Sequence, residues 1–237
     1  RAFNDAWYSA ALDLDFQLHL KVDGGPVGCW LHHRRDNRWE TGPELPADAL
    51  TNTEQADAFI DEFFKNTVPK KAAGVGIVLH VADEIAIAEI NPSHNDPANL
   101  ADLRQLVATA PASVIADSAL SAESHSWGLI PFPTPGSFPI ATAVTLSRRY
   151  DNFLEAFRTA GEQRNIPTRT TALSAPVALL DALPFLVEGE LDHPLVAVAH
   201  YPLLTTMAFF SAQGNLVLLR TLQHRGPRRP SGLRQAA

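Results

Sequence analysis

Strict alternation of apolar and polar residues marks the first predicted strand. Between residues 12 and 22 the apolar side chains occupy the even positions and the polar ones the odd positions. This period of two is typical of a β-strand with one face toward water. Gly24 and Gly25 follow and predict a turn into a second strand over residues 27–32. The chain therefore opens with a β-hairpin.

Four later segments repeat their apolar residues every three to four positions, which predicts amphipathic helices beginning near residues 51, 96, 147 and 176. Residues 51–54 form a capping box for the first helix, and Ser147 is the expected N-cap of the third, which Gly161 closes. One face of each helix should pack against a sheet. The core residues that these faces predict are Phe59, Phe63, Phe153, Phe157, Leu179 and Leu183.

Extended segments separate these helices. Residues 76–81 and 84–90 predict two strands joined by a short turn, and residues 127–130, 140–146 and 166–171 predict three more. Hairpins that alternate with helices indicate a layered α/β or α+β fold.

The last part of the chain predicts three strands in succession. Residues 195–199 form a short apolar run, as expected for a strand buried on both faces. Residues 205–210 are β-branched and aromatic, and Gln213 with Gly214 marks a turn into a returning strand over residues 216–222.

The residue pattern of these strands resembles the second phosphate-loop hairpin of actin-like ATPases, especially the pilus and secretion assembly proteins PilM and GspL. That pattern is Asp-hydrophobic-Gly, Thr-Thr, a Gly turn, Arg-Thr and a later Gly. The resemblance covers residues 50–226 and implies an actin-like (ribonuclease H-like) domain with a small inserted subdomain, truncated or reduced in its second half. The matching residues of this chain are Thr205, Thr206, Gly214, Arg220, Thr221 and Gly226.

The same resemblance divides the chain into four segments. Residues 1–71 would hold the N-terminal hairpin and helix of the actin-like domain, and residues 72–139 the inserted small subdomain. Residues 140–226 would form the actin-like core with the second hairpin, and residues 227–237 a basic tail.

Two departures from the pattern indicate that the nucleotide site is degenerate. His200 stands at the position of the metal-organising Asp, and histidine is a poor ligand for Mg²⁺. Pro202 stands at the position of the phosphate-loop Gly, and proline has no N–H and a fixed φ. We therefore expect no bound cofactor, no metal and no catalytic residue at the phosphate-loop positions, which are His200, Tyr201, Pro202, Thr205 and Thr206.

The first hairpin of actin-like ATPases also carries a phosphate loop, and the sequence indicates none here. The nearest candidate, residues 13–15, lacks glycine, and Asp15 would repel a phosphate. This is a second sign of a lost nucleotide site.

Composition narrows the classes of function. The formal net charge of −7 argues against nonspecific nucleic-acid binding, and the single cysteine, Cys29, excludes an intramolecular disulfide. The sequence has no Walker loop and no Gly-x-Ser-x-Gly motif. A metal site that uses His19 and His32 across the first hairpin is an open alternative to histidines that are packed or solvated.

The end of the chain has the opposite charge to the rest. Residues 225–237 carry Arg225, Arg228, Arg229 and Arg234 and no acidic residue. Because the total of −7 includes these four positive charges, the preceding residues carry −11. This contrast predicts contact of the tail with anionic lipid, and a solvated linker is the alternative.

The resemblance implies a non-catalytic structural subunit of a bacterial type IV pilus or type II secretion inner-membrane platform. Such a subunit would be cytoplasmic, peripheral to the inner membrane, and bound to the cytoplasmic tail of a membrane platform protein similar to PilN or GspM. It could also form homo-oligomers. One alternative is an active actin-like ATPase or sugar-kinase-like phosphotransferase. The other is an unrelated α/β metal-dependent enzyme.

Overall fold

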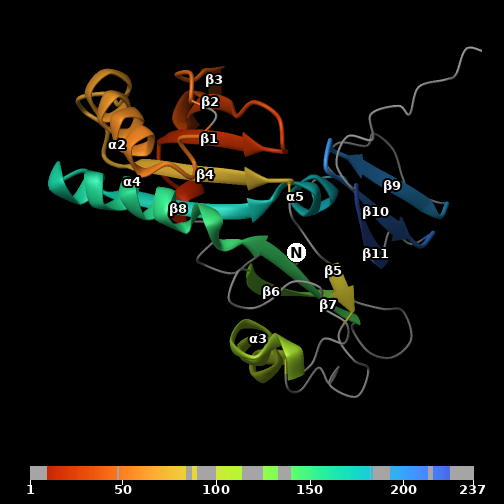
Figure 1. Ribbon diagram of the computed structural model, residues 1–237. Coiled ribbons are helices and arrows are strands. Elements are labelled where there is room, and N and C mark those ends of the chain that lie inside the picture. The colour runs from red at the N-terminus through yellow and green to blue at the C-terminus, as the bar shows by residue number, and fades with distance from the viewer. Residues whose placement is uncertain are drawn as a thin grey trace, which may run out of the picture.

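The strands in the described part of the chain form three sheets (Figure 1). The computed structural model describes residues 10–46, 48–83, 87–89, 100–113, 125–132, 140–181, 183, 193–212 and 216–224. One sheet has five strands in the order β3-β2-β1-β4-β8, and the others have three strands each, in the orders β5-β7-β6 and β11-β10-β9. The strands are β1 (Phe16–Val22), β2 (Gly28–His33), β3 (Arg38–Thr41), β4 (Val75–Val81), β5 (Ile87–Glu89), β6 (His125–Phe132), β7 (Ile140–Ser147), β8 (Thr168–Ser174), β9 (Leu195–His200), β10 (Leu204–Phe210) and β11 (Leu216–Gln223). The α-helices are α2 (Thr53–Glu62), α3 (Leu100–Thr109), α4 (Asp151–Gln163) and α5 (Ala175–Asp181).

The five-stranded sheet determines the fold class. Its first three strands form an antiparallel meander, and β4 and β8 then join β1 in parallel. Leu18 of β1 lies opposite Leu31 of β2 and opposite Ile77 of β4. Antiparallel and parallel strands thus share one sheet, and helices pack on it. The predicted layered α/β fold class is therefore confirmed.

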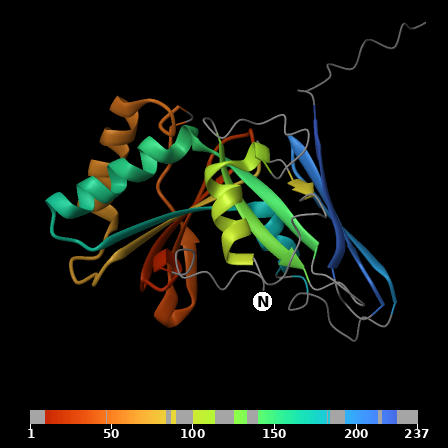
Figure 2. The same ribbon diagram turned by 90° about the horizontal axis from the view of Figure 1, so that it is seen from below.

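Helices α2 and α4 cover one face of this sheet and enclose a core of aromatic rings (Figures 1 and 2). Phe63 and Phe157 are fully buried, and their ring centroids lie 5.6 Å apart in an edge-to-face contact. Phe59 and Phe153 also contact Phe157, at 6.3 and 5.2 Å. These four residues were predicted to be core from helical periodicity, and the prediction is confirmed.

The prediction fails for Leu179, which is 43% exposed. Helix α5 has only seven residues, and Val177 and Leu180 are buried in it. Leu179 falls between these two positions and faces away from the packed side of the short helix. Leu183, also predicted as core, is half-buried.

The start of the first sheet differs from the predicted alternating strand. Residues 10–12 form a helical turn, and β1 begins only at Phe16. The polar face of β1 is largely shielded from solvent, because Gln17 is 1% exposed and His19 is 6% exposed. The Gln17 amide donates to the carbonyls of Leu12 and Leu14, at 2.6 and 2.8 Å. The preceding helical turn thus covers part of the face that was expected to meet water.

The predicted divisions at residues 72 and 140 would place β4 in the small inserted subdomain and β7 in the actin-like core. The sheets have the opposite membership. Strand β4 belongs to the five-stranded sheet, where it is buried on both faces between β1 and β8. Strand β7 belongs to the small sheet, where it pairs with both β5 and β6. The two strands expected over residues 76–81 and 84–90 are represented by β4 and β5, which lie in different sheets.

The helix starts also differ in detail. Asn52, rather than Thr51, is the N-cap of α2, and its side chain accepts a hydrogen bond from the backbone N–H of Gln55 at 3.2 Å. Ser147 ends β7 and does not cap α4. Gly161 lies inside α4, where an added Cβ would come within 2.0 Å of Thr168 Oγ1. The glycine allows close approach of helix and sheet instead of ending the helix.

The sheet β9–β10–β11 lies at the side of the molecule opposite α2 and α4 in both ribbon views (Figures 1 and 2). Ala199, Leu204 and Ala208 are buried, and α5 contacts β9 and β10. Val196 and Val198 are 52% and 58% exposed. The expectation that residues 195–199 are buried on both faces is therefore wrong, because β9 is an edge strand with one uncovered face. No described helix is long and apolar enough to span a membrane.

Candidate functional site

The loop between β1 and β2 is the first of two loops that meet at the ends of the strands. Gly24 has a φ of +89°, in the left-handed region that favours glycine. The carboxylate of Asp23 accepts a hydrogen bond from the N–H of Gly25 at 3.2 Å, and its other oxygen lies 2.7 Å from Lys21 Nζ. Residues 23–27 therefore occupy the position of the first hairpin loop, which sequence reasoning had sought at residues 13–15.

The loop between β9 and β10 is the second. The N–H of Tyr201 donates to the carbonyl of Leu204 at 2.8 Å, which closes the turn. The carbonyl of Leu203 accepts from the N–H of His224 at 2.8 Å. Pro202 is exposed at the tip and provides no N–H for a ligand. The three successive strands predicted for this part of the chain are confirmed, and they pair in antiparallel fashion.

The two loops are in contact, with the Leu203 side chain packed on Gly24. A Cβ added to Gly24 would lie 2.3 Å from Leu203 Cδ1 and 2.6 Å from Leu203 Cγ. Burial, together with the charge of Asp23, raises the pKa of the Tyr201 hydroxyl. The isobutyl group of Leu203 therefore lies against the first loop, and Tyr201 lies close enough to Asp23 for its charge to act on the hydroxyl.

The two threonines of the predicted phosphate-loop pattern point to opposite faces of their sheet. Thr205 Oγ1 lies 2.7 Å from His200 Nδ1 and 2.8 Å from His224 Nε2. Thr206 is fully buried, and its hydroxyl lies 3.0 Å from that of Thr221. Both hydroxyls are thus engaged in hydrogen bonds within the sheet. His200, Thr205 and His224 form a cluster that sequence reasoning did not find, because His224 comes from the far end of β11.

A buried carboxylate lies just beyond the end of β4. Asp83 is 5% exposed and accepts hydrogen bonds from the Arg149 guanidinium and the Tyr150 hydroxyl. Burial, reinforced by the hydrogen bond to Asp83, raises the pKa of Tyr150. The N–H of the preceding Ala82 donates to the carbonyl of Val22 at 2.7 Å. Asp83 therefore anchors the start of α4 beside the first loop.

The proposed histidine pair of the first hairpin does share one face. Gln17 Oε1 lies 2.8 Å from His19 Nε2 and 3.2 Å from His32 Nδ1, and His19 Nδ1 lies 2.9 Å from His80 Nε2. Burial lowers the pKa of His19 to about 3 and that of His80 to about 4. Among the described residues no group of three or more His, Cys, Asp or Glu side chains has the geometry to hold a metal ion.

Cys29 is buried in β2, and burial raises the pKa of its thiol to about 11. The thiol therefore stays protonated at neutral pH, which suits a packing role.

Neither the protein-family models nor the curated proteins compared with this chain include a match. Among solved structures, a Bacteroides thetaiotaomicron protein of actin-like ATPase fold and unknown function is similar at 10% identity, over 93% of this chain and 73% of that chain, with a TM-score of 0.48. A PilM–PilN type IV pilus biogenesis complex is similar at 15% identity, over 89% of this chain, with a TM-score of 0.49. This chain spans 61% of that second chain. These similarities concern the fold alone, and they agree with the predicted actin-like class.

Proposed function

We propose that this protein is a non-catalytic, actin-like structural subunit of a type IV pilus or type II secretion platform. The observation that supports the absence of catalysis is the contact between Leu203 and Gly24. An anion between the two loops would meet an apolar side chain instead of backbone N–H groups, and desolvating a charge without such partners is costly. Pro202 and the carboxylate of Asp23 make the same space still less suitable for phosphate.

The partner that we propose is the cytoplasmic segment of a membrane platform protein similar to PilN or GspM. The residue pattern around Thr205 and Arg220, which resembles that of PilM, supports this class of partner. The solved structure that is similar to this chain is a complex of PilM with PilN. The described edge of β9 offers a docking mode, because it is unpaired and carries the exposed Val196 and Val198. An extended segment can add to such an edge through main-chain hydrogen bonds.

The test is binding of the cytoplasmic segment of the PilN-like protein from the same genome, measured by fluorescence anisotropy. We expect saturable binding that Mg-ATP does not change and that Val198→Lys weakens. Leu222→Lys is the matched control, because Leu222 is 55% exposed on the opposite edge strand of the same sheet. Absence of saturable binding would contradict the proposed partner. An equal loss in both variants would place the segment on the open face of the sheet instead of on the β9 edge.

A further inference from the structure

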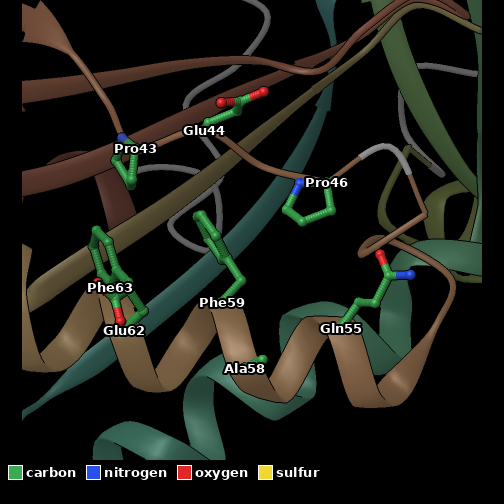
Figure 3. A pocket seen from close by; sticks show the side chains of 8 residues that line it. All are labelled: Pro43, Glu44, Pro46, Gln55, Ala58, Phe59, Glu62 and Phe63. Carbon is green, nitrogen blue, oxygen red and sulfur yellow. The ribbon is translucent and has the colours of Figure 1, made fainter.

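A pocket between the segment after β3 and helix α2 has no role in the function proposed above. It encloses about 320 Å³, at the low end of the range of about 300–1,000 Å³ that is usual for ligand pockets. Figure 3 shows Phe59 rising from α2 into the space between Pro43 and Pro46, and Glu44 and Glu62 also line the pocket. The pocket is therefore an apolar recess with carboxylates at its edge.

The open polar atoms around this recess are hydrogen-bond acceptors. One carboxylate oxygen of Glu62 accepts a hydrogen bond from Asn66 Nδ2 at 2.7 Å, and the other oxygen takes no part in this bond. Gln55 donates through Nε2 to Asp48 at 3.1 Å, while its Oε1 is buried without a partner among the described residues. Glu44 is exposed. A complementary ligand is a cation that has several donors and no acceptor, carried on an apolar stem.

An arginine side chain satisfies these requirements better than a lysine. Its guanidinium is planar, provides five N–H donors and stacks on aromatic rings. The same end of α2 already holds one such contact, because the Arg164 guanidinium lies 5.3 Å from the Phe64 ring centroid and pairs with Asp61. The recess beside it offers the edge of Phe59, two prolines and two carboxylates, and no arginine of the described residues lines it.

The chain itself contains a segment of the matching chemistry. Residues 225–237 read Arg-Gly-Pro-Arg-Arg-Pro-Ser-Gly-Leu-Arg-Gln-Ala-Ala, with four arginines, two prolines and no acid. Proline-containing segments favour extended conformations and dock in grooves lined by aromatic residues. The preceding residues carry a net charge of −11, which favours approach of this cationic segment.

A second copy is the better placed donor of this segment. Residue 224, where the described chain ends, directly follows β11, and the sheet β9–β10–β11 and α2 occupy opposite sides of the molecule in both ribbon views (Figures 1 and 2). We propose that the pocket lined by Pro43, Glu44, Phe59 and Glu62 binds an arginine of residues 225–237 from a second copy of this chain. The contact is head-to-tail, because it joins different surfaces of the two copies.

A labelled peptide of residues 225–237, titrated into the full-length protein and followed by fluorescence anisotropy, tests this proposal. We expect saturable, salt-sensitive binding that weakens about fivefold to tenfold in the double variant Glu44→Gln, Glu62→Gln. The matched control is Glu54→Gln, Asp57→Asn, which removes the same charge from exposed positions of α2 outside the pocket. This control should bind within twofold of wild type, and thermal unfolding should show that both variants are folded.

Self-association provides the second measurement. Sedimentation velocity of the full-length protein should show mass that grows with concentration, and Arg228→Gln with Arg229→Gln should suppress that growth as the pocket variant does. The proposal is overturned if the peptide does not bind, or if the pocket variant and its control lose affinity equally. It is also overturned if the peptide binds anionic vesicles but not the protein, which would assign the tail to lipid.

Discussion

The contact between the two loops predicts a specific thermodynamic coupling between Gly24 and Leu203. Replacing Gly24 by alanine adds a Cβ at a φ of +89°, where an L-residue is strained by about 1–2 kcal/mol. The same Cβ would lie 2.3 Å from Leu203 Cδ1, far inside the optimal separation of about 3.5–4.0 Å for two carbon atoms. Overpacking typically costs about 1–3 kcal/mol more, and the cost lies toward the low end where the tip of a partly exposed side chain such as Leu203 can move aside.

Gly24→Ala should therefore destabilise the wild-type protein by about 2–5 kcal/mol. In a Leu203→Ala background the clash is removed and the strain remains, so the same substitution should cost only about 1–2 kcal/mol. The difference is a coupling free energy of about 1–3 kcal/mol.

A double-mutant cycle measured by urea denaturation, with far-ultraviolet circular dichroism as the signal, gives this coupling directly. Gly25→Ala is a useful comparison, because an added Cβ there has its closest contact at 3.4 Å, with Asp23 Oδ1. Additivity of Gly24→Ala and Leu203→Ala to within about 0.5 kcal/mol would refute the contact between the loops.

Two further predictions concern the core and the buried histidines. Phe157→Ala should lower the free energy of unfolding by about 3–5 kcal/mol, because Phe157 is fully buried among four phenylalanine rings. Leu179→Ala, at a 43% exposed position, should lower it clearly less in the same denaturation assay. Equal losses would contradict the described helix faces. The folded-state pKa of His19 is about 3 and that of His80 about 4, both below the usual 6.5, so the unfolded chain takes up protons first and stability falls as pH decreases from about 6.5 to 4, by at most about 1.4 kcal/mol per pH unit and per histidine. Replacing both histidines by glutamine should flatten this part of the stability profile, and an unchanged slope would show that these two groups do not cause it.

The helix faces could be predicted from the sequence because burial there follows a local period. Phe59, Phe63, Phe153 and Phe157 recur at the spacing of one helical face, and tertiary packing agrees with it. The prediction fails at Leu179, where α5 is too short for its periodicity to define one face clearly. Local pattern is thus informative in proportion to the number of turns over which it is repeated.

The strands were harder to assign, because burial in a sheet depends on what covers each face. Gln17 and His19 read as water-facing positions, yet the helical turn at residues 10–12 and the Trp39 ring cover them. Val198 reads as buried, yet it lies on the open face of an edge strand. Strand β3 was not expected at all, because all four of its residues are exposed and carry no apolar alternation.

The candidate site shows the same limit. The Thr205-Thr206 pair and the following turn could be found because they lie together in the sequence. The contact between Gly24 and Leu203 joins hairpins from the two ends of the chain, and no local pattern reveals it. The signal that was available is the Asp23-Gly24-Gly25 turn between two alternating strands, which is the topological position of the first loop.

Calorimetric titration of the full-length protein with Mg-ATP tests the central claim most directly. We predict no saturable heat, because Leu203 fills the space that faces Gly24 and Pro202 lacks the N–H that a phosphate loop requires. Thermal unfolding should agree, since a ligand at 100 times its dissociation constant would add about 2.7 kcal/mol of stability. A micromolar dissociation constant for Mg-ATP that is lost in Gly24→Val would contradict the account and assign these loops to a working nucleotide site.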